Sequence, residues 1–151
     1  MSLLKEVQQK QVKDLFDKKL AGNVKLVVFT QEMECQYCQE NRQLMEEIAA
    51  LSDKITVEVH DFVSDRDSVE KYKVDKIPAT VILGQKDYGV RFYGIPAGYE
   101  FTSLVSSILA VSRGESGLSE ETKAALSRLK DPVHIQVFVT LTCPYCPGAV
   151  D

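Results

Sequence analysis

The sequence has no apolar stretch approaching the roughly 20 residues that a membrane-spanning helix needs. Its first twenty residues carry a charge every few positions and no apolar core segment, so we expect no secretory signal. It also lacks a basic surplus, because the net charge is −4, and its Tyr and Phe residues are not interleaved with Lys or Arg. These absences argue against a nucleic-acid partner and against a membrane location.

Cysteine is scarce, and all four cysteines fall in two CxxC pairs, Cys35/Cys38 and Cys143/Cys146. This is not the scattered framework of a secreted, disulfide-stapled protein. We therefore predict a cytoplasmic chain whose cysteines are catalytic or metal-binding rather than structural.

Apolar periodicity predicts a chain that alternates helices and strands and then closes with a hairpin and a helix. A Gly22-containing turn should end the first helix, and Ser64 or Asp65 should cap the third. The order αβαβαββα predicts an α/β fold with a mixed sheet flanked by helices. The expected elements are helix 2–20, strand 24–29, a helix from the first CxxC to residue 51, strand 55–60, helix 65–72, strands 79–83 and 88–93, and a helix with an apolar stripe over 101–109.

The first CxxC pair lies between a strand and a helix, the layout of a redox-active dithiol. The positive end of the helix should lower the pKa of Cys35, and Cys38, one turn into the helix, should be more buried and resolve the mixed disulfide. A zinc site is the alternative, but zinc knuckles are usually about 15–20 residues apart. Here 104 residues separate Cys38 from Cys143, and neither His60 nor His134 has ligand spacing to a pair, so we predict no metal.

Three further residue positions are candidate substrate contacts. Ile77-Pro78 stands 43 residues after Cys35 and directly before a strand. A cis bond there would expose the backbone of Ile77 to an extended substrate, whereas the simpler interpretation is a proline that starts a strand. Tyr37 and Tyr145 each precede the second cysteine of a pair and should shield the dithiol and touch substrate, although a packing role is also open.

The chain repeats itself in its last part, because helix 119–130, strand 133–139 and the second CxxC follow the order of the first unit at an offset of about 108 residues. We expect residues 1–113 to form a first unit, 114–131 a linker with a connecting helix, and 132–151 the incomplete start of a second unit. About 70–80 residues would complete that copy. Alternatively, strand 133–139 adds to an edge of the first sheet.

Three stretches resemble the thioredoxin superfamily. Residues 72–80 (YKVDKIPAT) resemble the segment that leads into its cis-proline, and residues 142–146 (TCPYC) match the glutaredoxin active-site string. The tandem pairs, together with residues 87–101 (DYGVRFYGIPAGYEF), resemble the glutaredoxin-like protein disulfide oxidoreductases of thermophilic archaea and bacteria.

This resemblance implies a thioredoxin-like fold and dithiol–disulfide exchange with protein substrates in the cytoplasm. It implies Cys35 and Cys143 as nucleophiles, Cys38 and Cys146 as resolving thiols, and Ile77-Pro78 as a substrate loop. No cofactor is implied beyond the cysteines, and a flavin-dependent thioredoxin reductase would supply electrons. Two alternatives remain open at this point: a non-enzymatic zinc- or partner-binding module, and an electron relay to a peroxide-reducing system.

Overall fold

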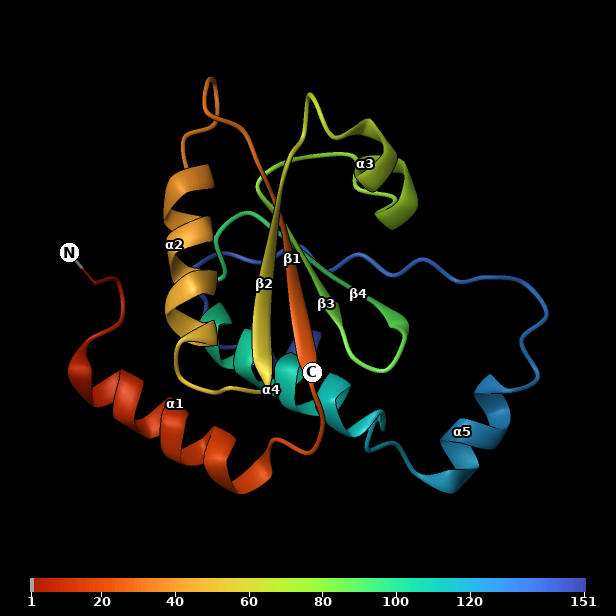
Figure 1. Ribbon diagram of the computed structural model, residues 1–151. Helices are drawn as coiled ribbons and strands as arrows, with labels where there is room; N and C mark the ends of the chain where they lie inside the picture. The colour runs from red at the N-terminus through yellow and green to blue at the C-terminus, as the bar shows by residue number, and fades with distance from the viewer. Residues whose placement is uncertain (1) are drawn as a thin grey trace.

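The computed structural model describes residues 2–151 and has a four-stranded mixed sheet at its centre (Figure 1). The strand order is β2-β1-β3-β4, with β1 parallel to β2 and antiparallel to β3, and β4 antiparallel to β3. The predicted mixed α/β fold and the order αβαβαββα are confirmed. The elements are α1 (Glu6–Lys19), β1 (Val24–Thr30), α2 (Cys38–Ala49), β2 (Ile55–Asp61), α3 (Arg66–Tyr72), β3 (Ala79–Leu83), β4 (Asp87–Tyr93), α4 (Glu100–Arg113), α5 (Glu120–Leu126) and α6 (Pro147–Val150).

The central strand β1 is apolar on both faces because helices cover both faces of the sheet. Leu26 and Val28 belong to the larger core cluster, which they share with α1, α2 and α4. Val27 and Phe29 belong to a second cluster on the opposite face, which α3 closes. A strand that is buried on both faces has a continuous apolar sequence, and this accounts for the apolar run at residues 24–29.

Helix α4 contributes the apolar stripe that the sequence predicts. Leu104 and Ile108 are fully buried, Val105 and Leu109 are nearly so, and Phe101 packs partly buried against the same cluster. Residues at this spacing lie on one helix face, so the helix covers the sheet on one side. The polar residues Ser103 and Ser112 are buried on this helix as well. The predicted apolar stripe is confirmed, and it belongs to the larger core cluster.

Two helix ends differ from the prediction. Helix α1 is followed by an extended Leu20 rather than by a glycine in a left-handed turn. Gly22 serves a close approach instead, because a Cβ there would lie 3.0 Å from the Ser112 carbonyl oxygen. Helix α5 ends at Leu126, earlier than expected, although the Ser119 hydroxyl caps it by accepting from the Thr122 N–H at 3.1 Å.

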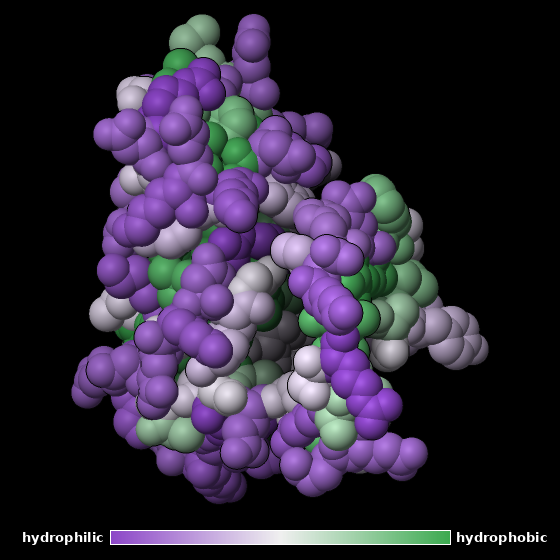
Figure 2. All heavy atoms as spheres, turned by 90° about the vertical axis from the view of Figure 1, so that its right-hand side faces the viewer, coloured by the Kyte–Doolittle hydropathy of each residue, from purple (hydrophilic) through white to green (hydrophobic). Residues whose placement is uncertain are grey.

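The predicted strand at 133–139 is wrong. This segment is extended, but no part of the described chain, residues 2–151, pairs with it, and it joins neither edge of the sheet. Most of its side chains are exposed, with Ile135 at 81% and Phe138 at 90%, and only Val139 is partly buried. Apolar residues can signal a strand, but a strand forms only where a neighbouring strand offers its backbone groups. Figure 2 shows this side of the molecule, with hydrophobic side chains gathered at the right of the view.

Candidate redox site

The first CxxC pair lies at the end of the sheet where β1 finishes and β3 begins. Register places Phe29 opposite Ala79 and Thr30 opposite Asp61. The loop that follows β1 therefore meets both the Ile77-Pro78 segment, which precedes β3, and the loop that follows β2 (Figure 1). The strand order alone thus brings three segments that are distant in sequence to the end of the sheet where the cysteines lie.

Cys35 and Cys38 form a disulfide with their Cα atoms 5.5 Å apart. Cys35 is partly exposed, whereas Cys38 is fully buried, so the predicted difference in burial is confirmed. Helix α2 begins at Cys38, and Cys35 precedes it, which corrects the expectation that the whole motif forms the first turn. Tyr37 occupies the N-cap position and provides no side-chain cap. The first backbone N–H groups of α2 are therefore uncapped close to the disulfide.

The Ile77-Pro78 peptide bond is cis, as its place in the sequence suggests. Pro78 is buried, and its carbonyl oxygen accepts from the Gly94 N–H at 2.8 Å. Within residues 2–151, no hydrogen bond engages the backbone N–H or C=O of the partly buried Ile77. These groups are free to pair with an extended chain in the manner of an added strand.

Apolar side chains are exposed around this end of the molecule. Met33 is 74% exposed, Val63 in the β2–α3 loop 53%, and Tyr37 48%. Glu32 and Glu34, in the loop before Cys35, are exposed as well, so their carboxylates are solvated. The surface that a partner would meet is therefore apolar at several points, as is common where one protein docks on another.

Charged groups at this end are held by local hydrogen bonds. The Asp61 carboxylate accepts from the N–H groups of Ser64 at 2.8 Å and Val63 at 2.9 Å, and these bonds lower its pKa. The hydrogen bond from Lys76 lowers the pKa of Asp75, the residue two positions before Ile77. Both carboxylates stay ionised at neutral pH and shape their loops rather than contact the cysteines.

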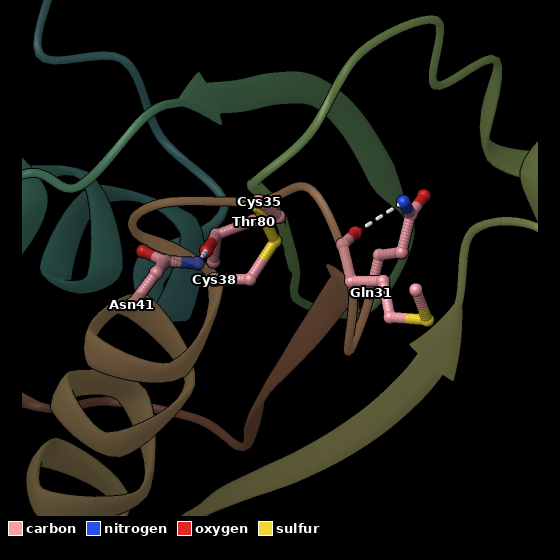
Figure 3. Close-up of a disulfide and its surroundings, with 6 residues drawn as sticks. Gln31, Cys35, Cys38, Asn41 and Thr80 are labelled. Carbon is pink, nitrogen blue, oxygen red and sulfur yellow. Dashed lines mark hydrogen bonds between the residues drawn. A yellow bond between two sulfur atoms is a disulfide. The ribbon is translucent and has the colours of Figure 1, made fainter.

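A buried polar pair lies beside Cys38 and was missed from the sequence. The Asn41 amide nitrogen donates to the Thr80 hydroxyl at 3.1 Å, and both residues are fully buried. Figure 3 shows the pair next to the disulfide, with the amide nitrogen on the side of Thr80 and Cys38. A signal existed, because Asn41 is a polar residue within the apolar face Cys38, Leu44, Met45 and Ile48 of α2.

The family of this fold follows from comparison with known proteins. A model of the thioredoxin domain matches residues 23–106, which include the whole sheet and the first CxxC pair. The chain belongs to the thioredoxin domain family. The match ends within α4, so the thioredoxin domain corresponds to the part of the chain that surrounds Cys35 and Cys38.

Two solved structures resemble this thioredoxin-domain protein over 97% of its length. One is a protein disulfide oxidoreductase from Aeropyrum pernix k1, with 33% identity, a TM-score of 0.89 and 64% of that chain covered. The other is the alkylhydroperoxide reductase protein AhpF from Enterococcus faecalis, with 26% identity, a TM-score of 0.79 and 70% of that chain covered.

Longer bacterial proteins contain a similar region. The chain is 33% identical over 108 residues to a Bacillus subtilis protein named NADH dehydrogenase, and the match covers 71% of this chain and 19% of that one. It is 31% identical over 112 residues to the F component of alkyl hydroperoxide reductase from Xanthomonas campestris pv. phaseoli, covering 74% of this chain and 19% of that one. The thioredoxin-domain protein thus spans about a fifth of the length of these curated relatives.

The second CxxC pair has a different setting. Cys143 and Cys146 also form a disulfide, but both are partly exposed, and Tyr145 between them is 87% exposed. The segment is anchored to the thioredoxin domain where the Tyr99 N–H donates to the Leu141 carbonyl oxygen at 3.2 Å. The short helix α6 begins directly after Cys146. Within the described residues, no strand leads directly into this pair, whereas β1 leads into the first one.

Histidine and carboxylate side chains form no metal centre in the part of the chain that the structure describes. No group of three or more His, Cys, Asp or Glu side chains within residues 2–151 is arranged so that it could hold a metal ion. His60 instead contacts two carboxylates, Glu58 at 2.7 Å and Asp65 at 3.4 Å, and stacks on Phe29. Over the same residues, no helix has the length and apolar character needed to cross a membrane.

Proposed function

We propose that this thioredoxin-domain protein is a protein dithiol–disulfide oxidoreductase in which Cys35 is the nucleophile and Cys38 the resolving cysteine. The observation that carries this proposal is the Cys35–Cys38 disulfide, which joins one partly exposed residue to one fully buried residue. A thiolate from a partner reaches the exposed sulfur, and the buried one becomes the leaving group. The similarity to the disulfide oxidoreductase from Aeropyrum pernix k1 supports the same chemistry.

The exchange runs in two balanced steps. In the first, the Cys35 thiolate attacks one sulfur of a substrate disulfide, a mixed disulfide forms, and the other substrate sulfur leaves as a thiolate that takes a proton from water. In the second, the Cys38 thiolate attacks the Cys35 sulfur, the mixed bond breaks, and the remaining substrate sulfur leaves. The substrate gains two electrons, and the Cys35/Cys38 pair loses two.

The substrate is a protein segment in extended conformation. The unpaired backbone groups of Ile77 support this choice, because they can bind any sequence through main-chain hydrogen bonds. Pro78 and Tyr37 contact the same substrate segment, and the exposed Met33 and Val63 extend the contact area. By analogy of motif, Cys143 acts as a nucleophile, Cys146 resolves, and Tyr145 contacts substrate at the second pair.

The reductant and the location are part of the proposal. A flavin-dependent reductase of the thioredoxin reductase type returns two electrons to the Cys35/Cys38 disulfide, so the chain needs no cofactor of its own. A cytoplasmic location fits cysteines that occur only in CxxC pairs. Oxidation of NADPH by such a reductase in the presence of this protein measures that electron transfer.

Reduction of insulin disulfides by dithiothreitol tests the main proposal. The wild type should accelerate the reaction, and a Cys35→Ser variant should fall to the rate without protein if the Cys143/Cys146 pair is also replaced by serine. A Cys38→Ser variant should instead accumulate a mixed disulfide that a non-reducing gel detects. Unchanged activity of Cys35→Ser in that background would exclude Cys35 as the nucleophile. About one zinc per chain without a reducible disulfide would favour a metal-binding module.

A second candidate is an electron relay to a peroxide-reducing system. It is favoured by the relatives and the solved structure that carry the name alkyl hydroperoxide reductase. A mixture of this protein, a flavin-dependent reductase, NADH and a cysteine peroxidase distinguishes the two. A relay accelerates peroxide consumption and leaves insulin untouched, whereas a general oxidoreductase reduces insulin as well.

A further inference from the structure

The Asn41 side chain has a position that packing does not explain. It is fully buried on the core-facing side of α2, among Cys38, Leu44 and Met45, where a leucine of similar volume would fit the apolar stripe. Its amide oxygen has no hydrogen-bond partner in the described residues, 2–151. A buried polar group without a partner lowers stability, and such groups are few in native proteins. Asn41 therefore lowers the stability of the protein without being required by the fold.

Thr80 fixes the orientation of this amide. Its hydroxyl accepts from the Asn41 nitrogen at 3.1 Å, and the side chain of Asn41 makes no other hydrogen bond within residues 2–151. The amide nitrogen carries two protons, so one N–H remains after the bond to Thr80. Figure 3 shows the nitrogen turned toward Thr80 and Cys38, while the oxygen points away from the disulfide.

Cys38 needs a hydrogen-bond donor when the disulfide is open. To resolve a mixed disulfide, its thiol must lose a proton in a fully buried site, and burial raises the pKa of a thiol. A neutral donor that faces the sulfur favours the thiolate and so opposes the effect of burial. The remaining N–H of Asn41 is the group available for this role, because Asn41 lies one helical turn from Cys38 with its nitrogen on the side of that residue.

Few other groups could tune this sulfur. Strand β3 has no titratable residue, and in β1 only Lys25 is charged, but it is exposed and bonds Glu58 at 2.8 Å. On α2 the nearest charge, Glu40, is exposed, and on α4 the charged residues Glu100 and Arg113 lie at the two ends. In the loop before Cys38, the titratable residues Glu32, Glu34 and Tyr37 are exposed. Cys35 also neighbours this sulfur, and in the mixed disulfide it carries no proton.

We propose that Asn41, oriented by Thr80, donates its second amide N–H to the Cys38 sulfur in the reduced and mixed-disulfide forms. This inference rests on the proposed exchange reaction and adds a residue to it. The Cys38 thiolate then attacks the Cys35 sulfur as described above, with no change in the bonds formed or broken. Thr80 acts as a positioning residue, because it contacts the amide and sets its direction.

The pKa of Cys38 tests this without any substrate. In the full chain with Cys35→Ala, Cys143→Ser and Cys146→Ser, Cys38 is the only thiol, and its ionisation is followed by ultraviolet thiolate absorbance. Adding Asn41→Leu should raise the pKa of Cys38 by about one unit, a tenfold change in the ionisation constant. Thr80→Val should move it in the same direction, whereas Thr80→Ser, which keeps the hydroxyl, should leave it unchanged.

The exchange kinetics give an independent readout. Asn41→Leu should leave formation of the mixed disulfide unchanged and slow its resolution about tenfold at neutral pH, with the pH profile moved to higher pH. An unchanged Cys38 pKa in both Asn41→Leu and Thr80→Val overturns the inference, and Thr80→Val alone decides it if Asn41→Leu does not fold. If the wild type fails to reduce insulin but the pKa shift is observed, the proposed function is wrong and the Asn41 contact stands.

Discussion

Glu47 connects the N-terminal segment to the helix that carries Cys38, and its negative charge should contribute measurably to the free energy of unfolding. Its carboxylate accepts from the backbone N–H of Leu3 at 2.9 Å and of Leu4 at 2.9 Å, and from the hydroxyl of Ser2 at 2.9 Å. The Gln43 amide adds a fourth donor at 2.7 Å. Burial raises the pKa of Glu47, but these four hydrogen bonds together outweigh it and lower the pKa from 4.5 to about 2.

The size of the effect follows from this lowered pKa. A shift of that extent corresponds to about 3 kcal/mol as an upper limit, and the partial exposure of the carboxylate reduces it to about 1–2 kcal/mol. The unfolded chain binds the proton more tightly than the folded one, so this stabilisation is complete above pH 4.5 and is lost as the pH falls toward 2.

Glu47→Gln removes the charge and places an amide group among N–H donors. We expect urea unfolding at pH 7 to give a free energy of unfolding about 1–2 kcal/mol below that of the wild type. At pH 3 this difference should shrink by more than half. Glu46→Gln on the same helix is the matched control. Its carboxylate is exposed and pairs with Arg42 at 2.7 Å, so the change should stay within about 0.5 kcal/mol.

Two outcomes would contradict this reasoning. One is a Glu47→Gln variant as stable as the Glu46→Gln control at pH 7. The other is a loss of stability that does not depend on pH, because that would assign the effect to packing rather than to the carboxylate charge. Hydrogen exchange at Leu3 and Leu4 adds a local readout, since both amides should exchange faster in Glu47→Gln.

Two further predictions concern other parts of the fold. Gly84→Ala should lower the free energy of unfolding, measured with urea, by about 1–3 kcal/mol, since the new Cβ would lie 2.6 Å from the Val111 carbonyl oxygen. Gly148 has open space around it, so Gly148→Ala should leave the free energy of unfolding unchanged. Arg91→Lys should lower the free energy of unfolding by about 1–2 kcal/mol, because lysine cannot reproduce the two hydrogen bonds of 2.6 and 2.9 Å to the Asp87 carboxylate. An Arg91→Lys variant with wild-type stability would show that this pair contributes little.

The sheet and its covering helices could be predicted because their signals are local. A continuous apolar run such as 24–29 indicates a strand that is covered on both faces, and the spacing of Leu104, Ile108 and their neighbours indicates which side of α4 faces the core. The cis peptide before Pro78 was one of two interpretations, and the place of this proline before a strand and 43 residues after Cys35 favoured it. For the strand and for the helix the information lies within a short stretch of chain.

The features that were missed depend on contacts between distant residues. Asn41 and Thr80 are 39 positions apart, and their pairing follows only once α2 packs beside β3. The Glu47 contacts with Leu3 and Leu4 join residues 44 and 43 positions apart. The strand expected at 133–139 failed for the converse reason, because its sequence suits a strand but no described segment offers it a neighbour. Periodicity reports what a segment can bury, not what lies beside it.

The two CxxC pairs share a motif but differ in what surrounds them, and this difference bears on which sulfur a partner can attack. At the first pair, the sheet buries Cys38 completely, leaves Cys35 partly exposed and places a hydrogen-bonded amide beside the buried sulfur. One sulfur can meet a partner, and the other can only return to its neighbour. At the second pair, both cysteines are partly exposed, so either sulfur is open to attack. We therefore expect ordered resolution at the pair that the thioredoxin domain encloses, because the fold rather than the motif makes Cys38 less accessible than Cys35.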